Sequence, residues 1–116
     1  MANPNIAAAT SILGVTHSAA LGTGTSLLLT VPSDTVYKIN TISVCNITAS
    51  TITVNLQGTF PSSFRSLVKD ISIPATTTLV VTSKDTSFYL PETGSIYGGS
   101  SASSSAHIII SYEAIS

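Results

Sequence analysis

Hydrophobic residues alternate with polar residues along much of this chain, which is the spacing of a β-strand with one buried face. The clearest example covers residues 50–57, where Ile52, Val54 and Leu56 share one face and the residues that flank them are Thr, Asn or Gln. Successive side chains of a strand point to opposite sides of a sheet, and β-branched residues are enriched in strands. We therefore predict a half-buried strand over residues 50–57.

A second strand is predicted over residues 25–31. Leu27, Leu29 and Val31 fall on one face of this segment, and Leu28 falls on the other. The proline that follows has no N–H for a sheet ladder, so we expect the strand to end there. On this pattern Leu27, Leu29 and Val31 face the core.

The longest apolar segment, residues 35–47, predicts a strand that changes direction. Tyr37 and Ile39 lie on one parity, whereas Ile42 and Val44 lie on the other. Such a change within one strand requires an extra residue or a bend, as occurs where a strand turns the corner of a sandwich. We therefore expect a bulge in the middle of this strand.

The rest of the chain continues the same pattern of short strands. Three- and four-residue apolar spacing with good helix formers in between, the pattern of a helix, is missing, and most Gly and Pro residues fall between the apolar segments. About eight short strands at this spacing predict an all-β fold, an antiparallel β-sandwich of the jelly-roll type. The remaining candidate strands are residues 10–21, 66–73, 77–82, 87–90 and 105–115.

The end of the chain could be a flexible tail or the last strand of the domain. Residues 98–104 are Gly, Ser and Ala only, which is typical of a connection. In residues 105–115, however, Ile108, Ile110 and Tyr112 share one parity, and leaving such a strand unpaired would expose an aggregation-prone edge. We predict that residues 98–104 connect to a closing strand whose apolar face joins the core.

Composition limits the classes of partner. Four basic and five acidic residues give a net charge of −1, and charged residues make up 8 % of the chain against roughly 25 % in an average domain. This balance provides no basic surface for nucleic acid or for an anionic membrane. With 20 Ser and 17 Thr, hydroxyl groups carry most of the polarity. Such a surface has little charge repulsion to keep copies apart, which suits a protein that assembles.

The chain shows no sign of secretion or of membrane insertion. Residues 1–5 have neither the basic nor the apolar segment of a signal peptide, and Ser or Thr interrupts every apolar stretch. Cys45 is the only cysteine, so no disulfide can form within one chain, and its apolar neighbours predict a buried thiol. We expect one domain over residues 10–116, preceded by an extended arm over residues 1–9.

Catalytic, metal and cofactor sites are not predicted. His17 and His107 stand apart from any Gly-x-Ser-x-Gly motif or metal-ligand spacing, and the acidic residues are scattered. Residues 22–26 resemble a phosphate-binding loop only faintly, because they lack its lysine, and we interpret them as a hairpin turn. The glycosylation motif at Asn46 is interpreted as a chance match in a chain without a secretory signal.

Phe60 and Phe64 are the best candidates for a docking tip. They bracket a short Pro-Ser-Ser segment that is predicted to form a loop, and exposed aromatic side chains on loops often contact partners. The alternative, that the two rings cover an open end of the core, is equally consistent with the sequence.

Several segments of the chain, taken in order, carry a resemblance to a known group of proteins. They are residues 2–6, 11–14, 36–44, 71–81, 88–92 and 110–113. Their order resembles small virion structural proteins of tailed phages, especially those of cyanobacteria. The resemblance covers nearly the whole chain, although residues 98–104 depart from the group's usual turn. It implies a structural part of the phage particle, made in the bacterial host cytoplasm, with no enzymatic activity and no cofactor.

Within that group, the physical properties favour a capsid decoration, or cement, protein bound to the outer shell in many copies. The chain has no coiled-coil heptads for a fibre shaft. Its expected partners are the major capsid protein or other virion proteins and further copies of itself, as a trimer or a dimer, with no nucleic acid and no membrane. The residues expected to dock on the shell are Ala2, Asn3, Pro4, Asn5 and Ile6, together with Phe60 and Phe64. The arm that holds the first five can lie along a shell subunit or add a strand to a neighbour's open edge.

Other functions stay open at this point. The chain could be a tail, neck or baseplate adaptor, or a receptor-facing head domain. A small carbohydrate-binding module or hydrolase is a third reading, for which the sequence offers only scattered serines and histidines and no tryptophan.

Overall fold

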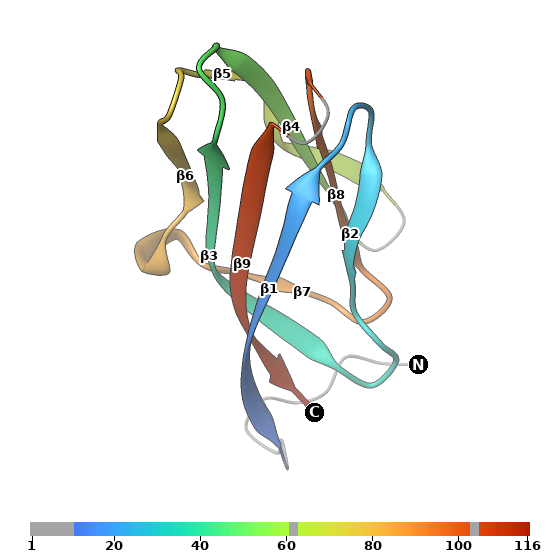
Figure 1. Cartoon of the computed structure of the whole chain (residues 1–116). Coiled ribbons are helices and arrows are strands. Elements are labelled where there is room, and N and C mark those ends of the chain that lie inside the picture. Colours follow the sequence, from blue (N-terminus) through green and yellow to red (C-terminus); the bar gives the residue numbers. More distant parts are fainter. Residues whose placement is uncertain (1–10, 61–62, 103–104) are drawn as a thin grey trace.

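The computed structural model describes residues 11–60, 63–102 and 105–116, and these residues form two antiparallel sheets packed face to face (Figure 1). They contain no α-helix, so no helix among these residues is long and apolar enough to cross a membrane. The predicted all-β sandwich is therefore confirmed. Its strands are β1 (Ile12–Leu21), β2 (Ser26–Thr30), β3 (Val36–Asn46), β4 (Ile52–Thr59), β5 (Phe64–Ile73), β6 (Thr78–Thr82), β7 (Phe88–Leu90), β8 (Ser95–Ser100) and β9 (Ala106–Ile115).

The strand order is that of a jelly roll. Sheet A has the order β1-β9-β3-β6, with β7 also paired to β3, and sheet B has the order β2-β8-β4-β5. The chain can be followed as one long antiparallel hairpin whose tip is the connection between β4 and β5. Along its two arms, β3 pairs with β6 and β7, β2 pairs with β8, and β1 pairs with β9. Rolling this hairpin up adds the pairs β3–β9 and β4–β8, which complete the two sheets.

The structure has nine strands where the sequence predicts eight, and one missed strand accounts for the difference. The strands β6 and β7 pair with successive parts of β3 and are separated by a short 3-10 turn, η2 (Lys84–Thr86), so together they occupy one strand position of the roll. The sequence predicts both of these segments. The strand that it misses is β8, which lies inside sheet B between β2 and β4.

The core fills the space between the sheets and follows the predicted alternation. On β4, Ile52, Val54 and Leu56 are all buried, as expected for a half-buried strand. On β9, every second residue from Ala106 to Tyr112 is buried. The largest fully buried side chains are Leu21, Val31, Ile39, Ile42, Val44, Val54, Leu56, Ile73, Leu90, Ile96, Ile108 and Ile110.

The bulge predicted in the longest apolar segment is present in β3. The register between β3 and β9 shifts between Ile39 and Thr41. Because of this extra residue, Tyr37 and Ile39 before the shift and Ile42 and Val44 after it are all buried. Beyond the bulge the partner on the other side of β3 changes from β7 to β6.

The faces predicted for β2 are partly wrong. Leu29 and Val31 are buried, but Leu27 is 54 % exposed. The register of β2 with β8 shifts between Leu27 and Leu29, and Leu28 packs against the core instead. A bulge thus reverses the parity of the first half of the strand, which the alternation alone could not reveal.

The C-terminal prediction is right for the last strand and wrong for part of the segment before it. The strand β9 lies between β1 and β3 in sheet A, so it is not a free tail. Gly98, Gly99 and Ser100, however, belong to β8 and pair with β4, so the connection does not begin until Ser101. Only glycine fits at positions 98 and 99 of this strand without a shift of its neighbours, because backbone and side-chain atoms of other residues occupy the space that a Cβ would need.

The glycine-rich segment at residues 22–26 is not a hairpin turn. It crosses between the sheets, because β1 pairs with β9 in sheet A and β2 pairs with β8 in sheet B. The carbonyl oxygen of Gly22 accepts a hydrogen bond from the amide of Ser100 at 2.9 Å, and Thr23 forms a bridge with the same residue. The segment therefore caps the end of β8.

Candidate interaction surfaces

The residues predicted to dock on a partner fall into two groups. Ala2, Asn3, Pro4, Asn5 and Ile6, with the rest of the predicted arm, lie outside the described residues. Phe60 and Phe64 stand at the two ends of the β4–β5 connection, where the amide of Phe60 donates to the carbonyl of Ser63 at 3.0 Å. Although both phenylalanines flank the same turn, the structure does not bring their rings together.

Phe60 closes one end of the core. Its ring packs against the core and meets Phe88 of β7 edge-on, with ring centroids 6.2 Å apart. The ring occupies the place that a side chain of Gly58 would need, since a Cβ there would lie 2.5 Å from it. The ring of Phe60 therefore covers this end of the core. Its contact with a partner stays a prediction.

Phe64 is exposed on the outer face of sheet B. Its side chain is 59 % exposed, and its ring lies 5.5 Å from that of Tyr97, measured between centroids. Tyr97 is paired with Leu27 on one side and with Gln57 on the other. We call Leu27, Phe64 and Tyr97 the sheet B patch.

The sheet B patch combines residues from three strands that are distant in the sequence. Two of its members escape sequence analysis, because Tyr97 lies in the unpredicted strand β8 and Leu27 is turned outward by the bulge in β2. Rings exposed on one face of a sheet provide a rigid apolar contact area at low cost in conformational entropy. This patch is the strongest candidate for a protein contact on the outer face of sheet B.

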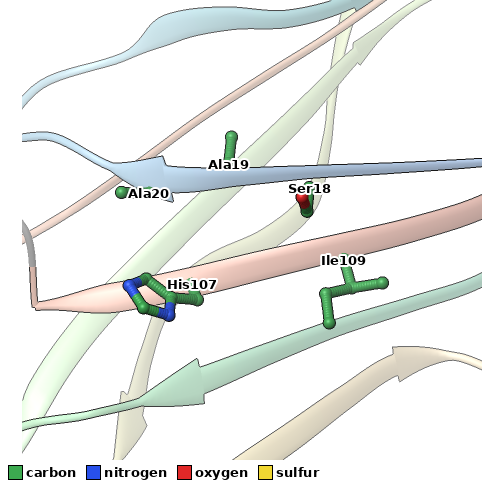
Figure 2. A pocket seen from close by; sticks show the side chains of 5 residues that line it. All are labelled: Ser18, Ala19, Ala20, His107 and Ile109. Carbon is green, nitrogen blue, oxygen red and sulfur yellow. The ribbon is translucent and has the colours of Figure 1, made fainter.

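A shallow pocket of about 300 Å³ lies on the outer face of sheet A, over β1 and β9. Figure 2 shows Ser18 and Ala20 on β1 beside His107 and Ile109 on β9, with Ala19 completing the lining. The pocket exists because Ala20, paired directly with His107, has a side chain too small to fill the space between its larger neighbours. Ser18 and His107 share this pocket, but its lining includes no carboxylate that could orient the imidazole as in a catalytic triad.

The two histidines serve different faces of sheet A. His17 is half-buried and paired with Ile110, whose side chain is in the core, whereas His107 is exposed on the outer face. Among the described residues, no three His, Cys, Asp or Glu side chains gather where they could hold a metal ion.

Cys45 is half-buried, so the prediction of a buried thiol is wrong. Its neighbours Val44 and Asn46 point into the core, and strand alternation places Cys45 on the outer face of sheet A, paired with His107 and Thr78.

Asn46 ties the two sheets together through a buried side chain. Its amide nitrogen donates to the carbonyl oxygens of Ser50, Ile73 and Pro74 at 2.8, 3.0 and 3.1 Å. Its amide oxygen accepts from the backbone N–H and the hydroxyl of Thr48 at 2.9 and 2.7 Å. The side chain has no exposed surface, so the glycosylation motif that begins at Asn46 has no accessible acceptor in the folded protein.

Tyr37 and Tyr112 stack inside the core, with ring centroids 4.4 Å apart. Burial raises the pKa of Tyr37 above its ordinary value, and the neighbouring charge and hydrogen bond of Tyr112 raise it further. Both rings are less than one-tenth exposed, so the pair has a structural role in the core.

Comparison of the chain with protein-family models, with curated proteins and with solved structures finds no match.

Proposed function

We propose that this chain is a structural protein of a tailed-phage virion and that it decorates the outside of the capsid shell. The observation that carries the proposal is the ordered series of segments, from residues 2–6 to residues 110–113, that resembles small virion proteins of cyanobacterial phages. The jelly-roll order supports it at the level of the fold, because such double-sheet sandwiches recur in viral capsid domains. A shared fold alone does not assign a function, so the proposal also depends on the chemistry of the exposed surfaces.

The outer faces of the sandwich suit contact with other proteins more than contact with ions or nucleic acid. The chain carries only nine charged side chains besides its histidines, and the sheet B patch exposes Phe64 next to Tyr97. A weak apolar contact of this size becomes effective when many copies bind one lattice, because the contributions multiply over the shell.

The mechanism on this proposal is mechanical. Packaged DNA presses the shell outward, and a small domain that bridges neighbouring shell subunits resists their separation. The arm over residues 1–9, in which Pro4 favours extended backbone, would add main-chain hydrogen bonds along a shell subunit. The sheet B patch would provide the apolar contact.

Binding to purified shells of the same phage tests this proposal. Deletion of residues 1–9 should leave the sandwich folded, as circular dichroism would show, and should abolish co-sedimentation with shells. Phe64→Ala should weaken binding several-fold, whereas Val80→Ala, which removes an equally exposed side chain from sheet A, should leave it unchanged. Shell binding that survives both the deletion and Phe64→Ala would refute the docking assignment.

The alternative placement, as a tail, neck or baseplate part or as a receptor-facing head domain, predicts a different distribution. A decoration protein binds at every equivalent position of the shell, while a tail part is restricted to one end of the particle. Failure to bind shells, together with binding to isolated tails, would favour the alternative.

A further inference from the structure

The sandwich has four sheet edges, and three of them are protected against pairing with another chain. In sheet B, β2 is five residues long and bulged, and β5 has two register shifts and carries Arg65, Lys69 and Asp70. In sheet A, the edge opposite β1 is divided into β6 and β7 by the turn η2. Short strands, bulges and charges are the devices by which proteins block edge-to-edge association.

The fourth edge, β1, has none of these devices. It is ten residues long, it pairs with β9 without a register shift, and it contains no Asp, Glu, Lys, Arg or Pro. Two apolar side chains near its start, Ile12 and Leu13, are each 60 % exposed. Among the described strands, β9 is the sole partner of β1, so the other side of β1 presents an unpaired ladder. An edge of this kind is a template for a further strand.

The backbone groups that face the free side can be identified from the pairing with β9. Just before β1, Ser11 and Ser116 exchange both of their backbone hydrogen bonds at 2.9 Å. The register from there to Leu21 is continuous, so the odd-numbered residues of β1 bond to β9. The N–H and C=O groups of Ile12, Gly14, Thr16, Ser18 and Ala20 therefore point toward the free edge.

We propose that two copies of this chain associate through β1, in an antiparallel pair related by a twofold axis at Thr16. In such a pair, directly opposite residues must share a face, so the sequence numbers of each opposed pair add up to an even total. Placing the axis at Thr16 opposes Gly14 to Ser18 and Ile12 to Ala20, and every free backbone group named above finds a partner. Moving the axis to His17 would oppose two histidines and leave Ile12 unpaired.

The side chains of β1 are complementary to themselves in this register. The large residues Ile12 and Leu13 at one end oppose Ala20 and Ala19 of the other copy. The pocket described above lies over Ala20, and it is bordered by Ser18 and His107 (Figure 2). Ile12 of one copy thus stands beside the pocket of the other, where its exposed side chain gains apolar contact. A twofold contact provides this exchange twice, which is how isologous interfaces achieve closure.

The occupant proposed for this edge is a second copy of the same chain. The strand meets only its own uncharged sequence, and a net charge of −1 per chain gives little repulsion between copies. The pair would join two copies of sheet A into one continuous sheet. The inference does not depend on the proposed role in a virion, because it concerns the protein alone in solution, and its test needs no shell.

Sedimentation equilibrium of the full chain tests the pairing. At about 100 μM protein, a concentration that reveals even weak dimers, we expect a mass of about 24 kDa, twice the 11.9 kDa of one chain. Thr16→Lys places two like charges opposite each other at the axis and should shift the protein to 12 kDa, about the monomer mass. The matched control, Thr78→Lys, adds the same charge to an exposed threonine of β6 and should leave the dimer intact. A monomeric wild type, or a dimer that survives Thr16→Lys in a protein with native circular dichroism, would overturn the proposal.

Cross-linking tests the register separately. With the native thiol removed by Cys45→Ser, Thr16→Cys should form a disulfide-linked dimer on mild oxidation, because the axis brings the two sulfur atoms together. Thr78→Cys in the same background should not. Addition of the arm of one copy to the β1 edge of the next would instead produce open chains of more than two copies without cross-links at Thr16, and that result would also overturn the proposal.

Discussion

The strands β8 and β9 follow one another in the sequence, and each lies in the middle of its own sheet, yet they are packed in opposite ways. The strand β9 fills its side of the core with Ile108, Ile110 and Tyr112. The strand β8 contributes Ile96 and then Gly98, and other residues approach its backbone where side chains would otherwise stand. In sheet A, the side chains of the inner strand β9 fill the core. In sheet B, side chains and backbone from other segments pack directly against the backbone of the inner strand β8.

The close approach to β8 occurs on both faces. A Cβ on Gly98 would lie 2.5 Å from the side chain of Leu56 and 3.0 Å from that of Leu28. A Cβ on Gly99 would overlap the carbonyl group of Gly24, in the segment that crosses from sheet A to sheet B. Glycine in a strand weakens the strand itself, but it lets neighbouring groups come close enough to replace the missing contacts.

The largest loss of stability is expected from a charge placed on the buried face of β9. Ile110→Asp buries a carboxylate in the core and should unfold the domain, at a cost of about 4 kcal/mol or more in the free energy of unfolding. Ile109→Asp is the matched control, because the neighbouring side chain is 46 % exposed on the outer face and its loss should cost less than about 1 kcal/mol. Urea denaturation followed by circular dichroism measures both. Native stability of Ile110→Asp would contradict the assignment of this face to the core.

A methyl group added to Gly99 of β8 should cause the next largest loss of stability. Gly99→Ala forces the backbone at Gly24 away from β8 and should cost about 3 kcal/mol of stability. Gly22→Ala adds the same group where no atom lies within 4 Å, and its effect should stay within about 0.5 kcal/mol. If the two variants have the same thermal midpoint, the backbone contact does not hold sheet B.

A smaller effect is expected at the polar link between the sheets. Asn46→Ala leaves the carbonyl oxygens of Ile73 and its neighbours without their donor, and we expect a loss of roughly 2 kcal/mol in chemical denaturation. The comparison variant is Asn55→Ala, which removes an exposed hydrogen bond to the amide of Asp70 and should cost under about 1 kcal/mol. Equal losses would mean that burial of the Asn46 amide adds nothing.

The smallest effect is a pH dependence that arises in sheet A. Because the pKa of Tyr37 is raised in the folded state, the folded protein holds this proton more tightly than the unfolded chain does. The contribution is complete below the unfolded value of about 10 and is lost as the pH rises through the higher pKa of the folded state. Wild type should therefore lose stability more steeply than Tyr37→Phe between pH 9.5 and 11, on the order of one titrating group. Parallel curves would show that Tyr37 does not titrate differently on folding.

The contrast between β8 and β9 also shows which strands can be predicted from the sequence and which cannot. Alternation identifies β9 and β4, and the parity change in residues 35–47 predicts the bulge in β3. The same reasoning fails at β8, because Gly98 and Gly99 are strand residues only by virtue of what lies against them. The β-propensity of a residue depends on its own side chain. The place of Gly98 and Gly99 in a strand depends instead on contacts between their backbone and residues that are distant in the sequence.

The surfaces were harder to predict than the core for a similar reason. Phe64 is identified from its loop, but its partner Tyr97 lies in the strand that the sequence misses. The exposed edge of β1 depends on which strands pair with it, and a half-apolar strand has the same sequence pattern at an edge as in the middle of a sheet. Local periodicity determines which face is buried, and only the topology determines which side of a strand is open.

Electron cryo-microscopy of intact phage particles is the most direct test of the proposal that this chain decorates a capsid. If the proposal is right, density for a two-layered jelly roll lies on the outer surface of the capsid, repeated at the junctions between shell subunits over the whole head. Density for the chain that is confined to the tail, neck or baseplate, or its absence from the particle, would contradict the assignment as a decoration protein.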